Sequence, residues 1–183
     1  MKFEEYIKLT RKTAVYPEED AQSYLYVGMM SELNEVCDKL SKSDYTVVGN
    51  SFTERQYTSI LNEIGDVCWF AARMYDEFEV LDVGHIIEIR EHPVPSMKLA
   101  AKEFKKALNK LVDGSGVMSK YLRKDEGKEK ELIDLISNIY YHVRIASMHL
   151  GIDKSMSKVF QCNIDKLFDR KDRGVLRGDG DDR

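Results

Sequence analysis

The chain has 183 residues, of which 43% are hydrophobic and 33% charged, and its formal net charge is −4. This length fits a single domain over residues 1–183 with room for a sizeable core. The presence of only three prolines is typical of a helical protein. The negative charge and the scattered lysines and arginines exclude the electrostatic footprint of a nucleic-acid-binding protein. No segment approaches the roughly 18 apolar residues of a membrane-spanning helix.

The amino-terminal residues and the cysteines indicate a cytoplasmic protein. The opening segment, MKFEEYIKLTRKT, carries acidic side chains where a signal peptide has its apolar core. Cys37, Cys68 and Cys162 are odd in number, far apart and next to apolar residues, which favours free thiols over a disulfide or a zinc site. We therefore expect a cytoplasmic protein without a membrane or nucleic-acid partner.

Hydrophobic periodicity predicts helices throughout the first half of the chain. A short helix is expected over residues 1–13, and a longer one over residues 17–41, where a proline followed by three acids suits a helix start. Residues 43–52 are polar and form a connector. The capping box Thr53-x-x-Gln56 then begins a third helix that ends near residue 78.

The second half is predicted to be helical as well. Residues 80–96 contain Gly84 and two prolines and are expected to form a partly extended linker, with a short helix around residues 85–90 as an option. Further helices are expected at residues 97–113, 130–150 and 155–171. Gly114-Ser115-Gly116 ends the first of these, residues 120–129 are left open between helix and loop, and residues 172–183 have the composition of a flexible tail.

Four acids stand out in the second and third predicted helices, as Glu32-x-x-Glu35 and Glu63-x-x-Asp66. Residues three apart lie on one side of a helix, so each pair can point at one spot. All four are expected among apolar neighbours, and an unpaired buried carboxylate costs several kcal/mol. Mg²⁺, with Mn²⁺ as the alternative, would neutralise such a cluster and bind substrate phosphates. For Asp66, a surface contact with Arg73 is the competing interpretation.

An internal repeat indicates an all-α helical bundle with a pseudo-duplication. Residues 33–38 (LNEVCD) are similar to residues 108–113 (LNKLVD), and residues 61–66 are similar to residues 132–137. In this register Glu32, Glu35 and Asp66 become Ala107, Lys110 and Ser137, so the second copy keeps the apolar pattern and loses acids. We expect an active repeat over residues 18–80 and a degenerate repeat over residues 96–171, packed as a bundle.

The order of the acids, with 27 residues (36–62) between the two motifs, resembles the signature of the MazG-like all-α nucleoside triphosphate pyrophosphohydrolases, which are related to the dimeric dUTPases. Other segments are similar to short, phage-type members of this family. These segments are residues 3–6 (FEEY), 11–17 (RKTAVYP), 63–70 (EIGDVCWF), 163–171 (NIDKLFDRK) and 178–183 (GDGDDR). The resemblance covers nearly all of the chain except residues 81–131.

The resemblance implies Mg²⁺-dependent hydrolysis of a (d)NTP to the (d)NMP and pyrophosphate. It implies that the metal ligands and catalytic acids are Glu32, Glu35, Glu63 and Asp66, with one of the glutamates orienting water. It also implies nucleotide contacts from Asn163, Lys166 and Arg170, and Lys39 is the nearest candidate for a phosphate contact. For Lys39, an ordinary Glu35–Lys39 pair within one helix is the equal alternative.

The sequence departs from the family pattern at one point. In short members the Asn/Lys segment follows closely after the second acid motif, whereas here the second repeat intervenes. Whether Asn163 and Lys166 reach the site is therefore open. Family members commonly build their bundle from two chains, so a homodimer is also left open, and a phage-encoded member would work in the host cytoplasm.

Other residues have weaker signals. Gly28, one turn before Glu32, either leaves room for a ligand or is simply a tolerated glycine. Trp69 and Tyr140 occupy matching repeat positions, where core packing is favoured over base stacking. The carboxy-terminal Gly-Asp-Gly-Asp segment lacks the length of a calcium loop. The four histidines have no metal-binding spacing and are expected at the surface or packed: His85, His92, His142 and His149.

Two alternatives to the pyrophosphohydrolase remain. The chain is either a non-enzymatic helical module that binds nucleotide or metal, which the decay of half the repeat favours, or a hydrolase that acts on (p)ppGpp, which is suggested for some MazG-like proteins.

Overall fold

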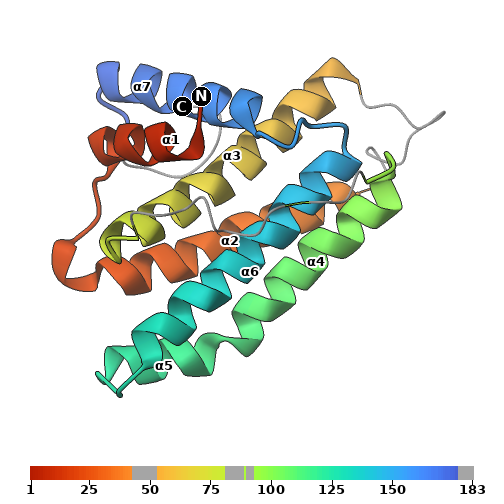
Figure 1. The fold of residues 1–183 in the computed structure, drawn as a ribbon. Helices are drawn as coiled ribbons and strands as arrows, with labels where there is room; N and C mark the ends of the chain where they lie inside the picture. Colours follow the sequence, from red (N-terminus) through yellow and green to blue (C-terminus); the bar gives the residue numbers. More distant parts are fainter. Residues whose placement is uncertain (43–52, 81–88, 90–92, 177–183) are drawn as a thin grey trace.

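The computed structural model describes residues 1–42, 53–80, 89 and 93–176 (Figure 1). Within these residues the chain forms α-helices and two short 3₁₀ helices and has no strand, so the predicted all-α helical bundle is confirmed. The long helices of the bundle are α2 (Ala21–Ser41), α3 (Glu54–Glu77), α4 (Met97–Asp113) and α6 (Lys128–His149). Helix α2 packs against α3 and α4, and α6 packs against α4 and α3.

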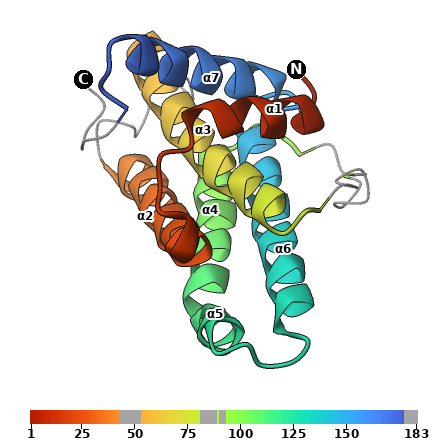
Figure 2. The ribbon, with the colours of Figure 1, turned by 90° about the vertical axis from the view of Figure 1, so that its left-hand side faces the viewer.

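Two further helices cover one side of α3. Helix α1 (Phe3–Thr10) and helix α7 (Ser157–Asp172) come from opposite ends of the sequence and pack against each other as well as against α3. Figure 2 shows them side by side across α3. This arrangement matters for the site, because it brings the carboxy-terminal helix against the middle of α3.

The predicted helix starts and core positions are largely confirmed. In the capping box, the Gln56 backbone N–H donates to Thr53 Oγ1 at 3.2 Å and the Thr53 N–H donates to Gln56 Oε1 at 2.9 Å. The apolar residues that recur at helical spacing on these two helices are buried, except that Phe78, the last of them and the C-cap of α3, is half-buried. The buried ones are Leu25, Met29, Leu33, Val36 and Leu40 on α2, and Ile60, Ile64, Val67, Ala71 and Met74 on α3. Periodicity of the apolar residues was therefore a sufficient guide to the bundle core.

The predicted end of the helix at Gly114 is confirmed, because α4 ends at Asp113 with Gly114 as its cap. A further helix, α5 (Ser115–Leu122), begins directly after Gly114, whose φ of −76° is ordinary helical backbone. A Cβ at this position would lie 2.2 Å from Leu135 Cδ2 of α6. The glycine thus also serves a close approach of two helices.

Other boundaries shift by a few residues. The first predicted helix divides into α1 and a 3₁₀ turn, η1 (Arg11–Thr13), and a second 3₁₀ turn, η2 (Glu18–Asp20), precedes α2. Within residues 120–129, α5 continues to Leu122 and the remainder turns through Gly127, at a φ of 72°, into α6. The connector 43–52, the optional helix at 85–90, His85, His92 and the tail from residue 177 lie outside the described residues.

An aromatic cluster holds α1 and α7 in place. The rings of Phe3 and Tyr140 stack at 4.7 Å between centroids, and those of Tyr6 and Phe160 stack at 4.5 Å. Tyr140 is almost fully buried here, so the expectation of core packing is confirmed for it. The stacked rings fix α7 relative to α3 and thereby set the position of the polar side chains on α7.

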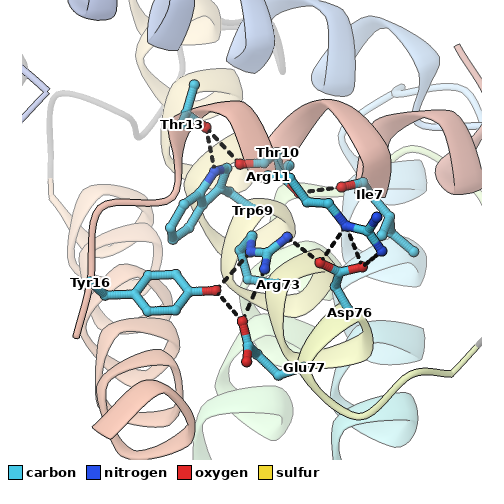
Figure 3. Close-up of polar contacts among 9 residues, drawn as sticks. All are labelled: Ile7, Thr10, Arg11, Thr13, Tyr16, Trp69, Arg73, Asp76 and Glu77. Carbon is cyan, nitrogen blue, oxygen red and sulfur yellow. Dashed lines mark hydrogen bonds and ion pairs between the residues drawn. The ribbon is translucent and has the colours of Figure 1, made fainter. Parts of the chain in front are cut away.

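A polar network ties the segment after α1 to the end of α3 (Figure 3). Arg73 is only 5% exposed and donates to Tyr16 Oη at 2.8 Å, to Asp76 at 2.5 Å and to Glu77 at 3.0 Å. Burial alone would raise the pKa of Asp76, but hydrogen bonds from Arg11 and Arg73 and their charges hold it below its usual value. The competing interpretation of a contact between Arg73 and Asp66 is therefore wrong.

Trp69 also belongs to this anchoring region. It is 9% exposed, and its indole N–H donates to Thr13 Oγ1 at 3.0 Å (Figure 3). A packed indole with a satisfied donor supports the expected structural role.

Candidate functional site

Three of the four predicted acids meet between α2 and α3. Glu32 comes from α2, and Glu63 and Asp66 come from α3. One carboxylate oxygen of each lies within 4.8 Å of the other two. The two helices run in opposite directions (Figure 1), so the three-residue spacing on α3 places both of its acids against one turn of α2.

Glu63 is the most buried of the three acids, at 2% exposure. Its carboxylate forms an ion pair with the Lys39 ammonium of α2, which also donates to Ser59 Oγ at 2.9 Å. Lys39 thus contacts the neighbouring helix α3, and its contacts are not limited to a pair with Glu35 within α2. The pair explains how a carboxylate can be buried here without a bound ion.

Two of the contacts that hold Asp66 come from α7. Asn163 Nδ2 donates to Asp66 Oδ1 at 2.8 Å, and Lys166 Nζ pairs with Asp66 Oδ2 at 2.5 Å. Asn163 and Lys166 are therefore brought to the acids although about 100 residues separate them along the chain. The question that the sequence left open is answered in favour of a shared site.

Glu32 has no cationic partner among the residues that the structure describes. Burial, and then the negative charges of Asp66, Glu35 and Glu63, raise the pKa of Glu32 to about 8, while Lys166 opposes the shift. Within the described ranges, the ammonium groups of Lys39 and Lys166 pair with Glu63 and Asp66, and Glu32 adds a third carboxylate. A proton on Glu32 or a bound cation would balance its charge.

This donor set fits a hard divalent cation. Carboxylate oxygens are the ligands that Mg²⁺ and Mn²⁺ prefer, and a partly buried site with surplus negative charge favours a cation over bulk water. Glu32, Glu63 and Asp66 could hold such an ion. Lys39 and Lys166 lie where they could meet an anionic ligand of that ion.

Glu35 departs from the prediction, because its side chain is exposed and it is not one of the three acids that converge. It lies about 60° around the helix from Glu32, and α3 covers only the Glu32 side. Its charge is nevertheless close enough to raise the pKa of Glu32. Glu35 therefore sits at the rim of the site. Arg170, one turn after Lys166 on α7, is half-buried.

The glycine, histidines and cysteines singled out in the sequence have contacts that suit a structural role. The ring of Phe70 lies over Gly28, where a Cβ would be 2.2 Å from Phe70 Cε1, so the glycine accommodates an aromatic side chain. His142 Nδ1 lies 2.8 Å from Glu103 Oε2, and His149 Nδ1 lies 2.7 Å from the Val94 carbonyl oxygen. All three cysteines are free, as expected; Cys68 is buried and the other two are half-buried.

Sequence reasoning missed three residues that shape the site: Tyr6, Ser59 and Gly65. Tyr6 Oη donates to Asn163 Oδ1 at 2.7 Å and lies 3.2 Å from the Gly65 carbonyl oxygen. Gly65 lets Asn163 approach, since a Cβ there would be 2.9 Å from Asn163 Cβ. The signal that could have found Gly65 was a glycine in a helix interior next to an acid, which usually has a packing reason.

No protein-family model, curated protein or solved structure matches the chain. The resemblance to MazG-like pyrophosphohydrolases therefore rests on the residues quoted from the sequence. None of the helices in the described ranges has an apolar stretch long enough to cross a bilayer.

Proposed function

We propose that the protein is a Mg²⁺-dependent nucleoside triphosphate pyrophosphohydrolase that cleaves a (d)NTP to the (d)NMP and pyrophosphate. The supporting observation is the convergence of Glu32, Glu63 and Asp66 from α2 and α3 with lysines from α2 and α7. Acids alone would suit many metal sites. Acids interleaved with ammonium groups suit a metal that is bound together with a polyphosphate.

Each residue then has a separate task. Glu32, Glu63 and Asp66 would hold the ion, which would supply charge neutralisation at the phosphates and a more acidic water. Lys39 and Lys166 pair with carboxylates of this cluster. With an ion held by the acids, the two ammonium groups would be able to contact phosphate oxygens and stabilise the charge on the leaving pyrophosphate.

Glu35 and Arg170 have outer positions in this proposal. Glu35 is exposed at the rim, one turn from Glu32, and could complete the ligand set or orient the attacking water. Arg170 follows Lys166 by one turn of α7 and would contact the nucleotide further from the ion.

The experiment is pyrophosphate release from a panel of NTPs, dNTPs and (p)ppGpp with Mg²⁺, with Mn²⁺ and with EDTA. We expect release from at least one (d)NTP with either ion and none with EDTA. Release from (p)ppGpp alone would mean that the substrate is (p)ppGpp and not a (d)NTP, while the proposed site would stay the same. Silence across the panel from a folded protein would contradict the proposed activity.

A non-enzymatic module that binds nucleotide or metal is the second candidate. The observation that favours it is the full burial of Ala107, the residue that stands at the position of Glu32 in the predicted second repeat. If the duplication holds, a chain that has lost acids in one half could have lost turnover in the other. Tight nucleotide binding without pyrophosphate release under either ion would support this candidate.

A further inference from the structure

The hydroxyl of Tyr6 is an unusual feature of the helical core. The side chain of Tyr6 is fully buried, and burial, followed by the charges of Cys68 and Asp66, raises its pKa well above the usual value. The hydroxyl therefore stays protonated and can donate a hydrogen bond at any physiological pH. Its nearest acceptor is Asn163 Oδ1, at 2.7 Å.

Asn163 connects this hydroxyl to the acids. It is 1% exposed, and its Nδ2 donates to Asp66 Oδ1 at 2.8 Å. An ionised carboxylate can only accept hydrogen bonds, so the amide must turn its NH₂ group to Asp66 and its carbonyl oxygen to Tyr6. In this orientation the amide oxygen of Asn163 accepts a hydrogen bond from the Tyr6 hydroxyl, so both ends of the amide have a partner. A flipped amide would place two oxygens against each other.

Gly65 provides the space for this chain of hydrogen bonds. A Cβ at Gly65 would lie 2.9 Å from Asn163 Cβ and 3.1 Å from Asn163 Nδ2. The absence of a side chain lets α7 lie close enough to α3 for the amide to reach Asp66. The Gly65 carbonyl oxygen, at 3.2 Å, is a second acceptor for the Tyr6 hydroxyl.

We propose that Tyr6 is a positioning residue for the acid cluster: through Asn163 it fixes the orientation of the Asp66 carboxylate, and so sets how tightly Glu32, Glu63 and Asp66 bind a divalent cation. The proposal rests on the function proposed above only in taking these acids as the ion's ligands. It gives α1 a part in the site, although no α1 side chain was predicted there. Partners of this kind typically alter metal affinity or activity by about 10–100-fold.

The chain offers a matched control in Tyr75. This tyrosine is also almost fully buried, at 1% exposure, and its hydroxyl donates to Ser137 Oγ at 3.0 Å on the side of α6. Tyr6→Phe and Tyr75→Phe each remove one buried tyrosine hydroxyl together with its hydrogen bonding. Only Tyr6→Phe removes a donor from Asn163.

The experiment measures Mn²⁺ binding by electron paramagnetic resonance of free Mn²⁺ for the intact chain and both variants. We expect Tyr6→Phe to weaken Mn²⁺ binding by about 10-fold and Tyr75→Phe to leave it within about twofold, with melting temperatures recorded for all three. Equal Mn²⁺ affinity in Tyr6→Phe and the intact chain would overturn the proposal. Equal weakening in both variants would also overturn it, because the effect would then be general to the core.

A double variant separates positioning from packing. If Tyr6 acts through the amide, Tyr6→Phe added to Asn163→Ala should weaken Mn²⁺ binding no further than Asn163→Ala alone. Fully additive losses would contradict the proposal. If Tyr6→Phe proves too unstable, Asn163→Ala alone tests the connection, because it removes the amide while the Tyr6 hydroxyl keeps the Gly65 carbonyl as an acceptor. Unchanged Mn²⁺ binding in Asn163→Ala would overturn the proposal.

The side-chain amide of Asn163 gives a readout that needs neither metal nor substrate. In ¹⁵N spectra its NH₂ signals should shift in Tyr6→Phe and stay in place in Tyr75→Phe, and unchanged signals in Tyr6→Phe would contradict the proposal. Weaker Mn²⁺ binding in Tyr6→Phe without any nucleotide hydrolysis would contradict the proposed function and support the role of Tyr6. Nucleotide hydrolysis with no effect of Tyr6→Phe on Mn²⁺ affinity would support the proposed function and contradict the role of Tyr6.

Discussion

At the scale of single residues, Glu32 is the least compensated charge of the cluster. Its pKa of about 8 in the ion-free chain, against a usual 4.5, means that the folded protein keeps a proton that the unfolded chain releases. Between these two pH values the free energy of unfolding therefore falls as pH rises, and the loss is complete above about pH 8. Below pH 4.5 the group is neutral in both states and has no effect.

Glu32→Gln removes this penalty, so the variant should be more stable than the unmodified chain above pH 8 without divalent ions. The difference should shrink as pH falls and vanish below about pH 4.5. Urea unfolding in EDTA across this pH range measures it. Added Mg²⁺ should stabilise the unmodified chain more than the variant. A variant that is less stable at pH 8.5 in EDTA would contradict the electrostatic description of Glu32.

Lys39 has the opposite role, because its ammonium neutralises a buried acid. Lys39→Met would leave Glu63, at 2% exposure, without that partner and should lower the free energy of unfolding in EDTA by roughly 3 kcal/mol. Lys106→Met is the control, since Lys106 is 45% exposed in its pair with Glu103 and should cost less than about 1 kcal/mol. Equal effects of the two substitutions in urea unfolding would mean that the Lys39–Glu63 pair stabilises the fold no more than an exposed ion pair does.

At the scale of helices, the packing of α7 against α3 decides whether the site is complete. Gly65→Ala should push Asn163 away from Asp66, because the added Cβ would lie 2.9 Å from Asn163 Cβ. The Cβ of Asn163 is attached directly to the backbone of α7, so it can move only if the packed helix moves. We expect a lower melting temperature together with weaker Mn²⁺ binding.

The control for this substitution is Gly116→Ala in α5, where a Cβ meets nothing within 4 Å. Alanine is the better helix former, so this variant should be slightly more stable, by about 0.5–1 kcal/mol, with unchanged Mn²⁺ binding. Thermal unfolding and the Mn²⁺ titration check both variants. Unchanged Mn²⁺ affinity in Gly65→Ala would show that the approach of α7 is not needed to hold the ion.

The helices themselves were largely predictable, and the exceptions have physical causes. Apolar periodicity depends on local spacing alone, and it located the core faces of α2 and α3 correctly. Gly114 correctly marked the end of α4, but the sequence did not show that the Leu135 side chain of another helix also requires a glycine there. A contact of that kind has no signature within the segment that contains the glycine.

The candidate site was predictable only in part, for the same reason. Three-residue spacing correctly paired Glu63 with Asp66 on one side of α3, but it could not show that α3 covers Glu32 and leaves Glu35 exposed. The approach of Asn163 depends on how α7 folds back over α3. Tyr6 looked like an ordinary apolar position, because the acceptor of its hydroxyl, Asn163, lies far away along the sequence.

At the scale of the whole molecule, the bundle pairs α2 with α3 and α4 with α6. This is the pairing that the predicted internal repeat requires, and the duplication itself stays a prediction. The first pair contains the acids, while α1 and α7 close over α3 and supply Tyr6, Asn163 and Lys166. The second pair provides buried apolar faces such as those of Phe104 and Leu111. The acids and the polar side chains that contact them thus lie at one side of one helix pair.

The most direct measurement of the central claim is Mg²⁺-dependent pyrophosphate release by Glu63→Gln beside the control Glu103→Gln. Like the buried Glu63, the half-buried Glu103 has a cationic neighbour, Lys106, but it lies in the α4–α6 pair. We predict that Glu63→Gln lowers kcat by about 100-fold or more because it removes a proposed ligand of the ion, whereas Glu103→Gln keeps activity within a few-fold. Full activity in a folded Glu63→Gln variant would contradict the assignment of the site.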